Sequence, residues 1–244
     1  MSGAEGKLDL ERIVFIGRTF DEYMQMFSLM EQDLVGQRIL DCPAGACSFT
    51  AIVNQLGGDA TAADIAYFHS IDELADKGVQ DIEHVKFELS KVQDNFVWEY
   101  FETIDDLAKA RKEALIDSTQ ARKQTPDRYV PVILPNLPFS DQTFDLTLSA
   151  HFLFMYSDRL DYEFHLKTVQ ELMRVTKEEL RIFPLVDLSG KRYEHLARLR
   201  EDLVSQGFIT EEIKVPYEFQ KGANQMLKIR RMSSEVDKKK TLTE

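Results

Sequence analysis

Cysteine is scarce in this sequence of 244 residues, which contains only Cys42 and Cys47. Their spacing fits neither a zinc-binding pattern nor a disulfide framework, so we expect two reduced, buried thiols and no metal site. Long apolar runs are also missing: none approaches the ~20 residues that a membrane-spanning helix needs. Residues 1–12 lack the apolar core of a signal peptide. We therefore expect a soluble, cytoplasmic protein.

Basic residues are outnumbered, because 30 lysines and arginines stand against 42 acidic residues and leave a formal net charge of −12. Such a charge repels both a nucleic-acid backbone and an anionic bilayer. We expect a small-molecule substrate, with neither nucleic acid nor membrane as a partner. No pattern in the sequence indicates the oligomeric state.

The sequence also lacks internal repeats and linkers rich in proline, glycine or serine. With 43% hydrophobic residues, a chain of this length can bury one sizeable core. We expect one domain over residues 1–232. The charged segment 233–244 is expected to be a disordered tail.

What the sequence does contain is an alternation of strand and helix patterns. Helices are predicted at 19–34, from Ser48 to the stop signal at Gly57, at 162–175 and at 192–206. Strands are predicted at 38–42, 59–64, 128–134, 144–150, 179–187, 209–215 and 225–232. This order predicts an α/β fold, a Rossmann-like seven-stranded, mostly parallel sheet with an antiparallel terminal strand.

The stretch 65–128 is too long for a single crossover helix. Its helix-forming composition predicts a helical insertion at about 84–128, over one edge of the sheet. An aromatic cluster lies within it: Phe96, Trp98, Tyr100 and Phe101. These rings either attach the insertion to the domain or also form the wall or lid of a substrate pocket.

A ligand-binding loop is predicted after the first strand, at 41–48, where Ala44, Gly45 and Ala46 allow a close approach to the backbone. The second strand ends at Asp64, whose carboxylate could accept hydrogen bonds from ribose hydroxyls. A solvated carboxylate at a strand end is the alternative. Taken together, the loop and the acid are compatible with several nucleotide-binding folds.

Four ordered segments resemble motifs of class I S-adenosylmethionine-dependent methyltransferases. They are 39–45 (ILDCPAG), Asp64 with Ile65, 137–146 (LPFSDQTFDL) and 171–175 (ELMRV). The resemblance runs from about Thr19 to Met232 and is closest to small-molecule members of the superfamily. Pro43 and Cys47 replace family glycines, and Ile133 replaces the usual acid before the Leu-Pro-Phe stretch.

The resemblance implies S-adenosylmethionine as the cofactor and assigns its contacts by position. The methionyl part would contact the first loop, Asp64 would hold the ribose, and Ile65 would pack on the adenine. The backbone near Ile133 and Leu137 would approach the adenine edge, and Ser149 would help close the pocket. The implied cofactor-binding set is Asp41, Pro43, Ala44, Gly45, Asp64, Ile65, Ile133, Leu137 and Ser149.

In-line methyl transfer needs alignment, and a base assists when the acceptor is a hydroxyl or an amine. His151, at the carboxyl end of the fourth predicted strand, is the candidate base, with Tyr156 as a second catalytic candidate and Asp158 as a further polar group. A structural role for His151 is the alternative. The loop 216–224 is expected either to reach over the acceptor pocket or to be an ordinary hairpin.

Two other functions remain open. The altered glycine loop favours a non-enzymatic module that binds S-adenosylmethionine or S-adenosylhomocysteine on the same fold. An NAD-linked oxidoreductase would also use an acid such as Asp64, but the first loop lacks the Gly-x-Gly-x-x-Gly spacing that seats a pyrophosphate.

Overall fold

The computed structural model describes residues 14–232, so the predicted tail at 233–244 lies outside the described residues. Within this range the strands form a seven-stranded sheet in the order β3-β2-β1-β4-β5-β7-β6. Strand bounds are β1 Arg38–Asp41, β2 Asp59–Asp64, β3 Tyr129–Pro131, β4 Phe144–Ala150, β5 Thr176–Phe183, β6 Phe208–Lys214 and β7 Gln225–Arg231. Strands β1 to β5 pair in parallel, whereas β7 runs antiparallel to both β5 and β6. The predicted fold class is confirmed.

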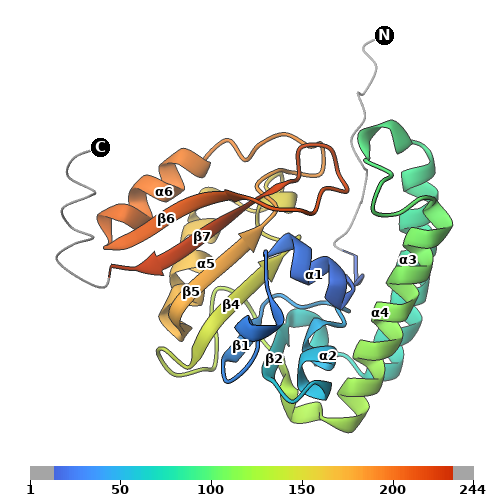
Figure 1. Ribbon diagram of the computed structural model, residues 1–244, viewed down its shortest axis with the longest axis horizontal. Helices are drawn as coiled ribbons and strands as arrows, with labels where there is room; N and C mark the ends of the chain where they lie inside the picture. The colour runs from blue at the N-terminus through green and yellow to red at the C-terminus, as the bar shows by residue number, and fades with distance from the viewer. Residues whose placement is uncertain (1–13, 233–244) are drawn as a thin grey trace.

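Helices cover both faces of this sheet, as Figure 1 shows. Their bounds are α1 Phe20–Met26, α2 Phe49–Gln55, α3 Ile71–Ser90, α4 Ile104–Gln124, α5 Tyr162–Val175 and α6 Leu196–Ser205. Adjacent residues of β1 face opposite ways: Ile39 packs in one core cluster with α1 and α2, and Leu40 packs in another with α5 and α6. This double burial explains why two adjacent residues of β1 are both apolar.

Helices α3 and α4 stand side by side at the end of the molecule away from β6 and β7 (Figure 1). They pack closely at Gly78, where an added Cβ would lie 2.6 Å from Leu115 Cδ1. Helix α4 also contacts α2. Because α3 already begins at Ile71, the helical segment between β2 and β3 starts before residue 84. The limits of the insertion and of the domain stay predictions.

Four predicted elements have bounds that differ clearly from those that the sequence pattern suggests. Strand β3, expected at 128–134, is only Tyr129–Pro131. The helix expected at 19–34 is only α1, because the chain turns at Ser28 with a φ of 47° and Met30 is exposed to solvent. Strand β5, expected at 179–187, begins at Thr176 directly after α5 and ends before Pro184. Helix α6, expected from residue 192, begins at Leu196.

Over residues 14–232, no helix combines the length and apolar character that crossing a membrane would require. Both cysteines are buried and unpaired with each other.

Candidate functional site

A cavity of about 620 Å³ opens at the carboxyl ends of four parallel strands. The segments that follow β1, β2, β3 and β4 each contribute to its wall, at 43–45, 64–66, 132–134 and 150–152. The sheet order reverses between β1 and β4, and ligands of open α/β sheets bind at such a switch point. The cavity therefore lies where the fold itself favours a ligand.

The loop after β1 is held down by the segment 14–18, which precedes α1. Gly45 has a φ of 55°, and a Cβ there would approach Ile16 O to 3.2 Å. A Cβ at Gly17 would lie 1.9 Å from Ala46 O, so these two backbones touch. The Ser48 amide donates to Arg18 O at 3.0 Å, which fixes the start of α2.

Cys47 replaces a family glycine, and its side chain has a structural role. Its Sγ accepts a hydrogen bond from the Arg18 amide at 3.2 Å and another from the Tyr23 hydroxyl at 3.3 Å. Burial raises the pKa of the Cys47 thiol to about 12, so the thiol is neutral. The thiol thus joins the first loop to the segment 14–18 and to α1.

Asp64 shapes the loop and faces the cavity at the same time. Its Oδ2 accepts from the Gly45 amide and its Oδ1 from the Ala66 amide, each at 2.8 Å. The side chain lines the cavity and is 8% exposed. Burial raises the pKa of this carboxyl, while the two backbone amides oppose the rise. Each carboxylate oxygen has a second lone pair, so Asp64 retains capacity for a ligand.

Six of the predicted cofactor contacts line the cavity together: Pro43, Ala44, Gly45, Asp64, Ile65 and Ile133. The other three are not among the described residues that line it. Asp41 is fully buried, with Oδ1 accepting from the Tyr23 hydroxyl at 2.9 Å and Oδ2 without a partner. Ser149 is buried in β4, and its Oγ also lacks a partner.

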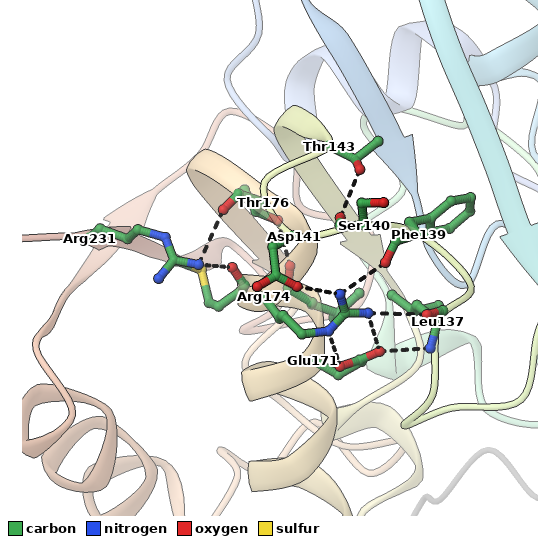
Figure 2. A network of polar contacts seen from close by, with 11 residues as sticks. Leu137, Phe139, Ser140, Asp141, Thr143, Glu171, Arg174, Thr176 and Arg231 are labelled. Atoms are coloured by element: carbon green, nitrogen blue, oxygen red, sulfur yellow. Dashed lines mark hydrogen bonds and ion pairs between the residues drawn. The ribbon is translucent and has the colours of Figure 1, made fainter.

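Leu137, the last of these three, is the point at which two sequence motifs meet. Glu171 Oε1 accepts from the Leu137 amide at 2.7 Å, and the Arg174 guanidinium donates to Leu137 O at 3.1 Å and Phe139 O at 2.9 Å. Arg174 also bonds Asp141 Oδ1 at 2.7 Å (Figure 2). The motif at the end of α5 therefore holds the loop that leads into β4.

His151 and Tyr156, the predicted catalytic residues, both line the cavity. His151 follows β4 with a φ of 51°, its ring packs edge-on against Phe183, and its Nδ1 is buried without a partner. Burial lowers the pKa of His151 well below its ordinary value, and the charges of Arg18 and Arg111 lower it further. Its imidazole is therefore neutral at physiological pH.

A buried charge cluster lies beside His151, and the sequence analysis missed it. Glu22, which is fully buried, accepts two hydrogen bonds from the Arg111 guanidinium of α4. The Tyr217 hydroxyl donates to Glu22 Oε1 at 2.7 Å, and Arg18 lies close enough to influence the same carboxylate. Arg18, Arg111 and Tyr217 all line the cavity. The pattern Thr19-x-x-Glu22 marks a capping box at the start of α1, but it gives no sign that Glu22 is buried.

The aromatic cluster of the insertion packs against the β6–β7 connection, and one of its rings reaches the cavity. Phe96 lines the cavity and packs against Phe219 with ring centroids 4.9 Å apart. Trp98 and Phe101 pack edge-on against the same ring, outside the described cavity lining. The predicted loop 216–224 also lines the cavity, through Tyr217, Phe219, Gln220 and Ala223. The insertion and the β6–β7 connection, which are far apart in the sequence, thus both contribute to the wall of the cavity.

The arrangement offers the Asp64 carboxylate with small residues, and a neutral imidazole with two phenols and two guanidinium groups. Such a cavity can hold a nucleoside-like ligand against Asp64 and place a second molecule beside His151. Across residues 14–232, no group of three or more histidine, cysteine or acidic side chains is arranged to hold a metal ion.

No protein-family model matches the sequence. Among solved structures, magnesium protoporphyrin IX methyltransferase from Synechocystis PCC 6803, with bound S-adenosylhomocysteine, superposes with a TM-score of 0.47 and 14% identity over 87% of this chain and 81% of that chain. A putative S-adenosylmethionine-dependent methyltransferase from Methanococcus maripaludis gives 0.44 and 14% over 89% and 85%.

A relative similar in sequence is the uncharacterised protein MJ0045 of Methanocaldococcus jannaschii. The two chains are 35% identical over 225 residues, which make up 92% of this chain and 99% of the relative. With this identity over nearly the full length of both, the chain belongs to the same protein family as MJ0045.

Proposed function

We propose that this protein is an S-adenosylmethionine-dependent methyltransferase that acts on a small-molecule acceptor. One observation carries the proposal: a single cavity, at the carboxyl ends of the parallel strands, contains both Asp64 with the Gly45 loop and the neutral His151 with Tyr156. The residues that would bind a nucleoside form one half of the cavity, and the candidate base with Tyr156 forms the other half. Transfer of a group between two bound molecules requires both to lie in one cavity.

The residues of the first half fit the cofactor. Asp64 presents a carboxylate for the ribose hydroxyls, and Gly45 leaves the backbone open to close approach. Ile65 and Ile133 line the cavity yet are 60% and 58% exposed, which suits side chains that would flank an adenine ring. Three predicted contacts do not line the cavity and would instead support the loops whose residues bind the cofactor: Asp41, Leu137 and Ser149.

S-Adenosylmethionine, when bound, supplies an electrophilic methyl group on a sulfonium. In-line displacement requires the acceptor to be aligned, and the surrounding wall provides this alignment. His151, held neutral, would accept a proton from the acceptor, and the Tyr156 hydroxyl would position it. The mostly apolar lining around both groups would limit competition from water.

A small-molecule acceptor is supported by the mostly apolar lining of the cavity and by the net charge of −12, which disfavours nucleic acid and anionic membranes. Two free, buried cysteines agree with a cytoplasmic location. A non-enzymatic module would bind the cofactor through the same Asp64 half of the cavity. A measurement of methyl transfer, and not of cofactor binding, therefore distinguishes such a module from a methyltransferase.

Titration calorimetry with S-adenosylhomocysteine tests the cofactor half. We expect binding to the wild type, and Asp64→Ala should weaken it by ~1–3 kcal/mol, because ribose hydroxyls would lose a charged acceptor. Asp72→Ala is a matched control, since this acid lies on α3 with its side chain 86% exposed and pairs with Lys123. If neither S-adenosylmethionine nor S-adenosylhomocysteine bound at about 1 mM, the proposal would fail.

A further inference from the structure

Among the described residues, the charge cluster beside His151 contains more positive than negative charge. Glu22 is fully engaged, since its two oxygens accept from Arg111, from the Tyr217 hydroxyl and from the Thr19 amide. One carboxylate therefore faces two guanidinium groups, those of Arg111 and Arg18. The Nε of Arg18 is buried and has no hydrogen-bond partner. One cationic charge is left over beside His151.

The other acids of the cavity wall have partners of their own. Among the described lining residues these acids are Asp64 and Glu73. Asp64 accepts the amides of Gly45 and Ala66, and Glu73 accepts the amide and the hydroxyl of Ser70. Neither forms an ion pair with Arg18. Among the described residues, the half-buried Arg18 guanidinium thus has no ion-pair partner and its buried Nε has no hydrogen bond, which favours an anionic ligand.

Apolar side chains from α3, α4 and the aromatic contact also line the cavity. Helices α3 and α4 contribute Val85, Leu89 and Leu107, and the aromatic contact adds Phe96 and Phe219. A ligand that fills this space must bury a hydrophobic body. A ligand with an ammonium group would meet two like charges in a site of low dielectric, which is unfavourable.

We propose that the acceptor is an apolar molecule with a weakly acidic hydroxyl, a phenol or an enol, whose oxyanion binds Arg18; the proposal rests on the methyltransferase function above. The acceptor O–H proton passes to the imidazole of His151, which lines the cavity. The oxygen then forms a bond to the methyl carbon as the carbon–sulfur bond breaks, and the electron pair of that bond stays on sulfur. The reaction is therefore O-methylation.

Two naphthalene probes with the same body and opposite charge test this assignment: 2-naphthol and 2-naphthylmethylamine. Binding is measured by calorimetry with and without S-adenosylhomocysteine, and ionisation of bound 2-naphthol is followed by the absorbance of its oxyanion. We expect 2-naphthol to bind the wild type at least about 10-fold more tightly than the amine and to ionise at lower pH than in solution.

Three variants identify the group responsible. Arg18→Met should abolish both the preference for 2-naphthol and its easier ionisation, whereas Arg18→Lys, which keeps the charge, should retain most of the preference. Lys109→Met removes the same charge from the exposed face of α4, where the lysine side chain is 77% exposed, and should change nothing.

A preference that survives in Arg18→Met overturns the proposal, as does equal binding of the amine to the wild type. The carboxylate of the cofactor is the other possible source of an anion. In that case bound S-adenosylhomocysteine would remove the preference for 2-naphthol, and Arg18→Met would lower the affinity for S-adenosylhomocysteine by a factor similar to that preference. This result would assign Arg18 to the cofactor, and the proposal would again fail. If S-adenosylhomocysteine does not bind at all, the proposed methyltransferase function fails. The preference of the wild type for 2-naphthol over the amine, and its loss in Arg18→Met, still test the anion site separately.

Discussion

The carboxyl group of Asp41 lies at the end of β1 with no exposure to solvent. Burial raises its pKa well above the ordinary value, although the hydrogen bond from the Tyr23 hydroxyl opposes the rise. The charged form of Asp41 is therefore disfavoured in the folded protein and favoured in the unfolded chain. The folded protein loses stability as this carboxyl ionises.

Because ionisation of Asp41 destabilises the folded protein, the Asp41→Asn variant should depend on pH differently from the wild type. Because the folded pKa is raised, the folded state holds the proton longer, and the free energy of unfolding of the wild type falls as pH rises above the unfolded pKa of about 4. The variant cannot lose this proton. We expect it to gain stability relative to the wild type between about pH 4 and pH 8 in urea titrations. Parallel pH profiles for the two proteins would contradict this account.

At the residue scale, part of the site follows from the sequence because it lies at strand ends. Gly45, Asp64 and His151 all directly follow or end parallel strands, and the carboxyl ends of such strands meet at one edge of a sheet. Arg18 and Arg111 could not be predicted in this way. They are far apart in the sequence, and only the packing of α4 against the start of α1 brings them together.

Among the elements, α1, α4 and the loop between β6 and β7 share one polar contact. Glu22 comes from α1, Arg111 from α4 and Tyr217 from the loop. Both members of the ion pair are nearly inaccessible, with side-chain exposures of 0% and 4%. Removal of one partner leaves the other charged, buried and unpaired.

We therefore predict that Arg111→Met or Glu22→Met alone lowers the free energy of unfolding by about 3–5 kcal/mol. The double replacement should be less destabilising than the sum of the two, because it leaves one unpaired charge in the cluster, Arg18, whereas Glu22→Met alone leaves both arginines unpaired. Urea denaturation of the four proteins in this cycle measures the coupling. Additive losses would mean that the two side chains stabilise the fold independently.

Element types were predictable, whereas some element ends were not. The periodicity of 162–175 and the apolar run of 144–150 match α5 and β4 in both bounds, because each is buried against the sheet or within it. The pattern of 19–34 is longer than α1, since its apolar residues continue to pack after the helix ends. Phe27, Leu29 and Leu34 are buried on a chain that has already turned at Ser28.

On the scale of the whole molecule, the cavity couples ligand binding to global stability. A ligand that binds only the folded state adds about 2.7 kcal/mol at a concentration of 100 Kd. For a chain of 244 residues we expect S-adenosylhomocysteine to raise the Tm by roughly 5–10 °C under these conditions. NAD should give no shift in the same thermal scan, because the first loop lacks the pyrophosphate-binding glycines. A shift with NAD alone would favour an oxidoreductase.

The cavity wall begins at Val14 and is completed by Ala223, close to the end of the described residues. A chain emerging from the ribosome therefore has no finished pocket until the connection between β6 and β7 has been synthesised. A fragment that holds only β1 and β2 contains Asp64 but lacks Tyr217 and Phe219. Ligand binding would thus report that the connection between β6 and β7 has been synthesised, and a product truncated before it would be recognised by its failure to bind.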